Sequence, residues 1–248
     1  MTRALRVVAG VLGALLSLAA LAAPVGFRPT TLVAAHRGGA ALWPENSLLA
    51  FRQALALGVD ALEFDLHMTA DGEVVVLHDP TLDRTSTGAG PVRDLRLVDL
   101  AAARLKTRDG AITDERVPTF AQLLDLAAPA SAELLPEIKV DGHRRRYDGV
   151  EEKVLALLRS RGLLARATVQ AFQPETIRRL RELELGATDL GMNHRLIDAE
   201  VMAAARDAGI RLAAWTVNEE ADIRRMVELG VDMVMSDRPD LVKRVTGR

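Results

Sequence analysis

The sequence predicts a (β/α)8 TIM barrel formed by a single domain. Short apolar or β-branched runs alternate with segments of helical period through most of the 248 residues. Eight such strands in a chain of this length suit a barrel, whose usual size is about 250 residues. Because periodicity alone does not separate a barrel from a doubly wound open sheet, the open sheet is the alternative fold. No Gly/Ser linker or change in composition divides residues 31–246, so we expect one domain there.

The expected elements follow one another in a regular order. Most of the helical segments end at a glycine, as helices commonly do. The expected strands lie at 32–35, 60–66, 74–77, 133–139, 167–172, 187–191, 210–217 and 232–235. The expected helices span 47–57, 119–128, 149–161, 174–185, 198–208, 219–229 and 239–245.

One connection departs from this order. After the third expected strand, residues 81–118 contain no helix of crossover length, although 94–105 could form a short one. Long loops in compact domains are often functional, and loops that leave the carboxyl ends of barrel strands lie on the catalytic face. We therefore expect a small excursion there, with its apolar residues covering the mouth of a pocket.

Composition excludes several classes of protein. The formal net charge is −2, which gives no reason to expect a nucleic-acid partner, because such proteins usually present a basic face to phosphates. The absence of cysteine excludes disulfides, zinc–thiolate sites and thiol catalysis.

The N-terminus predicts export or anchoring. Arg3 and Arg6 precede an apolar run over residues 7–23, which ends in the small residues of an A-x-A cleavage pair, Ala20 and Ala22. The run is also close to the minimum for spanning a bilayer, about 17 residues. Residues 1–23 are thus expected to be a signal peptide or a membrane anchor. Either would place the domain outside the cytoplasm, in the periplasm or the extracellular space.

Polar residues recur at the carboxyl ends of the expected strands. Residues two apart on a strand point to the same side, so Glu63 and Asp65 share a face, and so do Glu137 and Lys139. Three carboxylates that converge on one end favour a hard divalent cation, Mg²⁺ or Ca²⁺. The sequence therefore predicts Glu63, Asp65 and Glu137 as ligands of one metal ion.

The neighbouring residues indicate phosphoryl transfer. Arg37 and Lys139 would give an anion, most naturally a phosphate, a place beside the cation. His36 and His78 end the first and third strands and could serve as a general acid–base pair. No GxxxxGK[ST] sequence is present. Gln170 and Trp215 end two further strands, and Trp215 is expected at the pocket mouth. His67 follows Glu63 and Asp65 on the same strand face, but we expect it to support the site rather than act in it.

A series of motifs resembles the glycerophosphodiester phosphodiesterase family. The motifs run from about residue 32 to 241 and are HRGG (36–39), PENS (44–47), ExD (63–65), HDPTLDRTSTGAG (78–90), PEIK (136–139), WTVN (215–218) and SDRPD (236–240). The resemblance implies a TIM barrel that hydrolyses glycerophosphodiesters, such as glycerophosphocholine or glycerophosphoethanolamine, to glycerol 3-phosphate and an alcohol with a divalent cation. Position by position, it also implies the metal, histidine and phosphate roles given above, and a supporting place at the same rim for Glu45 and Asn46.

The resemblance leaves the substrate and the mechanism open. The substrate is expected to be a small phosphodiester or a lysophospholipid, and the run at 7–23 could associate the protein with a membrane. The alternatives are a lysophospholipase D or phospholipase C-like activity on membrane lipid, and a non-catalytic binding domain of the same fold. The expected mechanism uses the glycerol 2-hydroxyl as nucleophile through a cyclic phosphate, with direct attack by water as the alternative.

Overall fold

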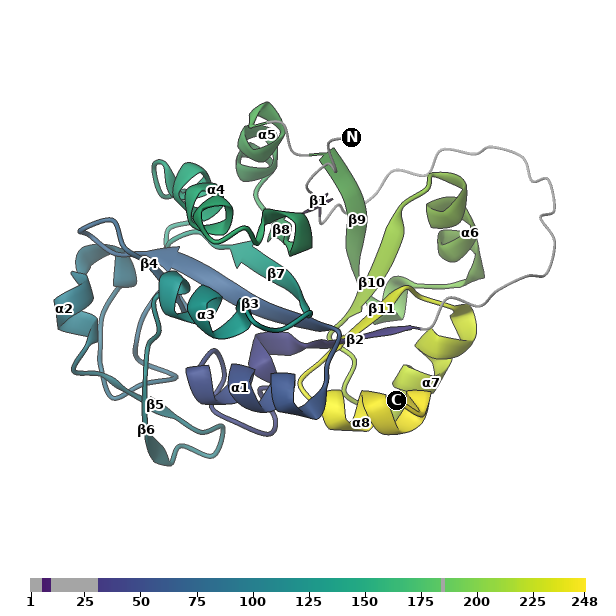
Figure 1. Cartoon of the computed structure of the whole chain (residues 1–248), viewed down its shortest axis with the longest axis horizontal. Coiled ribbons are helices and arrows are strands. Elements are labelled where there is room, and N and C mark those ends of the chain that lie inside the picture. The colour runs from purple at the N-terminus through teal and green to yellow at the C-terminus, as the bar shows by residue number, and fades with distance from the viewer. Residues whose placement is uncertain (1–5, 10–30, 184–185) are drawn as a thin grey trace.

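The computed structural model describes residues 6–9, 31–183 and 186–248 of the chain. Its main sheet has nine strands, of which all but β4 run parallel, and β2 pairs with both β11 and β3, so the parallel strands close into a barrel (Figure 1). The predicted barrel is therefore confirmed, and the open-sheet alternative is wrong. In order around the barrel its strands are β2 (Leu32–Ala35), β3 (Ala61–Met68), β7 (Glu133–Ile138), β8 (Thr168–Ala171), β1 (Arg6–Ala9), β9 (Gly186–Asn193), β10 (Arg211–Trp215) and β11 (Met233–Ser236).

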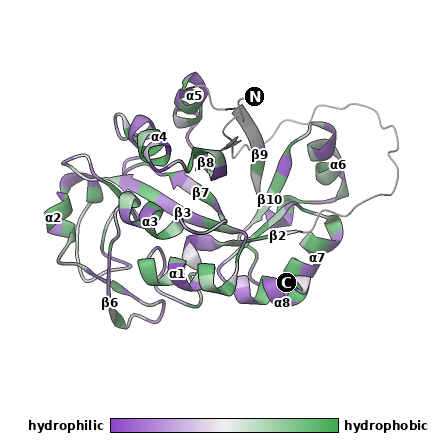
Figure 2. Ribbon diagram, in the orientation of Figure 1, coloured by the Kyte–Doolittle hydropathy of each residue, from purple (hydrophilic) through white to green (hydrophobic). Residues whose placement is uncertain are grey.

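Helices cover the outside of the barrel (Figure 1). Their ribbons change between hydrophilic and hydrophobic colours along each helix, as expected for helices with one face on a core (Figure 2). The Ser47 hydroxyl caps the first helix by accepting a hydrogen bond from the amide of Ala50 at 3.0 Å. The helices are α1 (Leu48–Leu57), α2 (Leu97–Leu100), α3 (Phe120–Ala127), α4 (Val150–Ser160), α5 (Pro174–Glu182), α6 (Ala199–Asp207), α7 (Glu220–Leu229) and α8 (Pro239–Thr246).

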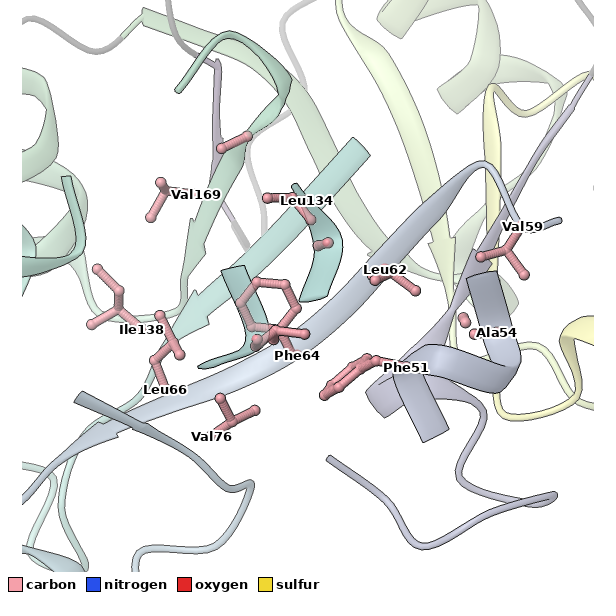
Figure 3. Packing of buried hydrophobic residues seen from close by; sticks show 14 of the residues in the cluster. Phe51, Ala54, Val59, Leu62, Phe64, Leu66, Val76, Leu134, Ile138 and Val169 are labelled. Carbon is pink, nitrogen blue, oxygen red and sulfur yellow. The ribbon is translucent and has the colours of Figure 1, made fainter. Parts of the chain in front are cut away.

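The alternation of β3 separates the core from the site. Leu62, Phe64 and Leu66 face the helices, where the ring of Phe64 packs edge-on against Phe51 with centroids 5.8 Å apart (Figure 3). The alternate residues Glu63 and Asp65 therefore face the barrel interior. Burial of the apolar face of β3 fixes the register of the strand, because a slip of one residue would place the carboxylates in the hydrophobic core.

The third expected strand is not a barrel strand. β4 (Val74–Val76) pairs antiparallel with β3, with Leu66 opposite Val76. Only residues 69–73 separate β3 from β4, which is enough for a hairpin, whereas a parallel crossover needs about a dozen residues or more. The hairpin still brings His78 to the carboxyl end of the barrel, since Leu77 donates its amide to the carbonyl of Asp65 at 3.0 Å.

The strand position between β8 and β9 is filled by β1. Arg6–Ala9 pairs in parallel with Thr168–Ala171 on one side and with β9 on the other. Most of the expected signal or anchor, residues 1–23, lies outside the described residues. Within the described part of the chain, no helix has the length and apolarity needed to cross a membrane.

The excursion after β4 forms a small layer with its own core. It contains α2 and a two-stranded sheet, β5 (Arg104–Lys106) with β6 (Ile112–Arg116). Val92, Leu100 and Leu105 pack with Val75 and Leu77 in a cluster separate from the main core. The expected short helix over 94–105 is thus reduced to Leu97–Leu100, because the remaining apolar residues enter this core through loops and β5.

Candidate active site

The carboxyl ends of the strands bring the predicted polar residues together. β2 leads into a 3-10 turn, His36–Gly38, in which Arg37 adopts a left-handed φ of 51°. This conformation is uncommon for a residue with a side chain. It turns the Arg37 amide toward β3, where it donates to Glu63 Oε2 at 2.8 Å.

Glu63, Asp65 and Glu137 form one buried cluster. Each offers a carboxylate oxygen, and these oxygens lie within 4.8 Å of one another. The pairing of β3 with β7 sets this geometry, because it places Asp65 opposite Glu137. The three predicted ligands are therefore adjacent, and together they could hold a divalent cation.

Burial and like charge shape the pKa values of the cluster. Burial and the neighbouring charge of Asp65 raise the pKa of Glu63 to about 8. Burial also raises the pKa of Glu137. Although burial opposes it, the charges of Lys139 and Arg37 lower the pKa of Asp65. Two carboxylates of three are thus held in a place that disfavours their charge, and a bound cation would reverse this effect.

Two cationic side chains lie against the cluster. Lys139 Nζ is 2.7 Å from Glu137 Oε1 and 3.1 Å from Asp65 Oδ1. Arg37 Nε is 3.5 Å from Asp65 Oδ2, is buried and donates a hydrogen bond to none of the residues that the structure describes. A buried guanidinium nitrogen without a partner is costly, so this one is available to an anionic ligand.

Each of the two predicted catalytic histidines is held by its own aspartate. His36 Nδ1 lies 2.5 Å from Asp237 Oδ1, and His78 Nδ1 lies 2.7 Å from Asp79 Oδ1. A hydrogen bond at Nδ1 fixes the ring orientation and leaves Nε2 for chemistry. Asp237 is held in turn by Asn218, whose Nδ2 donates to Asp237 Oδ2 at 2.8 Å.

The surroundings shift the pKa values of His36 and His78 in opposite directions. Burial alone would lower the pKa of His36, but the charge of Glu63 and the hydrogen bond to Asp237 outweigh burial and raise it. Burial lowers the pKa of His78, and the nearby carboxylates Asp65 and Asp79 offset it only in part. Such divergence is common in acid–base pairs.

The two histidines, the two cationic side chains and two of the carboxylates line one cavity of about 160 Å³. Gln170 and Trp215 line it, and Phe172 lies beside Trp215 with ring centroids 5.8 Å apart. None of its lining residues comes from 81–118, so the excursion does not cover this mouth. The charged and titratable residues of the lining are His36, Arg37, Glu63, His78, Glu137 and Lys139.

Glu45 and Asn46 support the site from behind. Glu45 Oε1 accepts from Arg37 Nη1 at 3.2 Å, and Asn46 Nδ2 donates to Asp65 Oδ2 at 2.9 Å. Neither residue lines the cavity, so both support the site through Arg37 and Asp65.

The sequence analysis missed an arginine that links the two sides of the site. Arg84 donates from Nε to Asp79 Oδ2 at 2.7 Å and from Nη1 to Glu45 Oε2 at 2.9 Å. It lies in the HDPTLDRTSTGAG motif, five residues after Asp79. This short spacing between an acidic and a basic side chain could have indicated the ion pair.

His67 supports His78 through the backbone. It is fully buried, with Nε2 3.1 Å from the carbonyl of His78 and Nδ1 2.8 Å from the Tyr147 hydroxyl. Burial lowers the pKa of His67 to about 4, so its ring is neutral at physiological pH. This geometry agrees with the supporting role that the sequence analysis expected.

A barrel with clustered carboxylates, cationic side chains and histidines at its carboxyl end suits a phosphodiester hydrolase, and the comparisons with known proteins identify the family. The model of the glycerophosphoryl diester phosphodiesterase family matches residues 36–188 and 183–241. A glycerophosphodiester phosphodiesterase of Caldanaerobacter subterraneus subsp. tengcongensis is 29% identical over 85% of this chain and 95% of its own. A probable glycerophosphodiester phosphodiesterase 1 of Mycobacterium tuberculosis is 31% identical over 85% of this chain and 90% of its own. The crystal structure of a putative member from Silicibacter pomeroyi superposes with a TM-score of 0.79 at 25% identity, over 89% of this chain and 94% of that one.

The chain therefore belongs to the glycerophosphoryl diester phosphodiesterase family, and it is an enzyme of that class.

Proposed function

We propose that this enzyme hydrolyses small glycerophosphodiesters to glycerol 3-phosphate and an alcohol, with one divalent cation and the pair His36 and His78. The observation that carries the proposal is the cavity that two carboxylates of the three-carboxylate cluster, two cationic side chains and both histidines line together. Glycerophosphocholine and glycerophosphoethanolamine are the simplest substrates of the class.

The proposed chemistry proceeds in two displacement steps at phosphorus, each assisted by proton transfer. One histidine takes the proton of the glycerol 2-hydroxyl, whose oxygen attacks phosphorus, while the other protonates the leaving alcohol. Water then opens the resulting cyclic phosphate, and the histidines exchange roles. Asp237 and Asp79 keep the two rings oriented throughout.

Electrostatic stabilisation comes from fixed groups around the phosphate. Lys139 and the unpartnered Arg37 Nε would contact the phosphoryl oxygens as negative charge builds on them. Glu63, Asp65 and Glu137 would hold Mg²⁺ or Ca²⁺, which supplies a further positive charge at the phosphate.

The first experiment assays glycerophosphocholine against lysophosphatidylcholine, each with Mg²⁺, with Ca²⁺ and with EDTA. We expect turnover of glycerophosphocholine that EDTA abolishes. Preferential turnover of lysophosphatidylcholine would instead assign a lysophospholipase D. Absence of turnover of either with both cations would leave a binding domain.

A substrate without the glycerol 2-hydroxyl tests the nucleophile. The 2-deoxy analogue of glycerophosphocholine should not be turned over, because it cannot form a cyclic phosphate. Unimpaired turnover of the analogue would exclude the cyclic route in favour of direct attack by water.

We propose further that the domain acts outside the cytoplasm. The support is the basic flank and apolar run of residues 1–23. Mass spectrometry of the protein from cell fractions tests this proposal. Mature chain beginning after Ala22 in the exported fraction identifies a cleaved signal, and the mature barrel would then lack β1. Intact chain in the membrane fraction, which keeps β1, identifies an anchor. Intact chain in the cytoplasm would refute both.

A further inference from the structure

A second cavity, of about 380 Å³, adjoins the active-site cavity. The two share His78, Glu137, Lys139 and Phe172. Every glycerophosphodiester has the same glycerol phosphate, which suits the smaller cavity, where the catalytic groups lie. The alcohol differs from one substrate to another, so we place it in the larger adjoining cavity. This placement rests on the proposed function.

The loop after β7 carries three successive arginines, Arg144 to Arg146, and Arg144 is the one that lines this second cavity. Two of them are neutralised by acids. Arg145 Nε lies 2.8 Å from Asp141 Oδ2, and Arg146 Nη2 lies 2.6 Å from the fully buried Glu151. Arg144 lines the cavity, and no ion pair or hydrogen bond of its guanidinium occurs within the described residues.

The backbone of this loop is shaped around Arg144. The Asp141 carboxylate accepts from the amides of His143 at 2.9 Å and Arg145 at 2.7 Å. These bonds close a tight turn, in which Arg144 has a left-handed φ of 62°. Of the residues that the structure describes, only three other than glycine have a positive φ, namely Arg37, Asn46 and Arg144. The first two belong to the active site, and uncommon backbone of this kind is often concentrated at functional sites.

The other charges of the second cavity already have partners. The Glu137 carboxylate binds Lys139, which also pairs with Asp65, and Asp141 binds Arg145. Burial lowers the pKa of His78, which favours its neutral form. Arg144 is therefore the cation left to a ligand in this cavity.

We propose that Arg144 binds an acidic group on the leaving alcohol, so that the enzyme prefers glycerophosphodiesters whose alcohol carries a carboxylate. A guanidinium can pair with a carboxylate through two parallel hydrogen bonds. Glycerophosphoserine and glycerophosphoethanolamine form a matched pair of probes, because they differ by one carboxylate and both carry the ammonium group.

The test measures kcat/KM for both probes at low salt. Wild-type enzyme should prefer glycerophosphoserine about two- to fivefold, as expected for an ion pair made by an exposed side chain. Arg144→Asn removes the charge and tolerates the left-handed backbone, so it should bring the ratio close to one. Arg144→Lys should keep part of the preference, and added NaCl should reduce it in wild type.

Arg145→Gln is the matched control. It removes a charge from the same loop, but one that is already paired, so both probes should change by the same factor. A wild-type ratio near one, or a ratio that Arg144→Asn leaves unchanged, would overturn the proposal while the proposed function stood. Absence of turnover of both probes with either cation would instead refute the proposed function, and with it this inference.

Discussion

Both ends of the barrel hold charged side chains in ion pairs, but among the described residues those at the carboxyl end are incompletely paired. At the amino end of the strands, Arg211 binds Glu133, with Nη2 3.0 Å from Oε2, and it also pairs with Asp189. Burial alone would lower the pKa of Arg211, but these two carboxylates outweigh burial and raise it. The charges at this end thus satisfy one another.

The carboxyl end has the opposite character. Glu63 has a raised pKa, Arg37 Nε makes no hydrogen bond within the described residues, and both Arg37 and Asn46 adopt left-handed backbone. An arrangement that is costly by itself persists where a ligand completes it. The comparison indicates that the amino end maintains the fold and the carboxyl end performs the chemistry, which is the usual division in this architecture.

The largest effect that separates the two ends should come from the metal cluster. We expect Asp65→Asn to abolish metal binding and to lower kcat/KM by at least about 10³-fold, since a cation contributes several kcal/mol to charge stabilisation. Isothermal titration with Mg²⁺ and Ca²⁺ measures the binding. If the variant bound metal as wild type does, Asp65 would not be a ligand.

The same cluster predicts a pH dependence in the absence of cation. Glu63 has a folded pKa of about 8 against an ordinary value of 4.5, so the folded state holds a proton that the unfolded state loses between these values. The free energy of unfolding in EDTA should therefore fall as pH rises from about 5 to about 8. Glu63→Gln should reduce that slope in denaturant titrations. A slope that the substitution does not change would show that another group is responsible.

The histidines should give the next largest effect. His36→Ala and His78→Ala should each lower kcat by about 10²–10⁴, the usual range for a positioned acid or base, while metal binding persists. A phosphodiester with a p-nitrophenol leaving group identifies the acid, because a good leaving group needs no protonation. The loss should shrink for one of the two variants, and if it shrinks for neither, the proposed division of roles is wrong.

Much of this site could be predicted from sequence, because its residues lie at the carboxyl ends of strands that the sequence pattern locates. Residues such as Glu63 and Asp65 follow from the two-residue period of a strand, and His36 from its place directly after an apolar run. The short connection at 69–73 also indicates that β4 runs antiparallel to β3. The sequence analysis counted residues 74–77 among eight parallel strands and so did not use this indication. Contacts between distant segments had no such signal. The pairing of His36 with Asp237 joins residues that are close only because β2 lies next to β11.

At the amino end, a substitution should affect stability and leave the chemistry intact. Arg211→Met removes the shared partner of Glu133 and Asp189, so we expect the free energy of unfolding to fall by about 1–3 kcal/mol, less than for a fully buried pair because Arg211 is partly exposed. Urea titration measures the loss. Below the unfolding transition kcat should equal that of wild type, and a large fall in kcat would show that the two ends are coupled.

The smallest expected effect concerns Arg84, which joins the two sides of the carboxyl end through Asp79 and Glu45. Arg84→Gln frees the Asp79 carboxylate that orients His78, so kcat should fall about tenfold, the size of one lost charge-assisted hydrogen bond. A merely structural role would lower kcat by the same factor in any background. If Arg84 instead acts by positioning His78, the substitution should cost little once His78 is already alanine, and its full effect should remain in His36→Ala. Equal losses in both backgrounds would show that Arg84 holds the loop and not the histidine, and a loss that disappeared only with Glu45→Gln would show that it acts through Arg37.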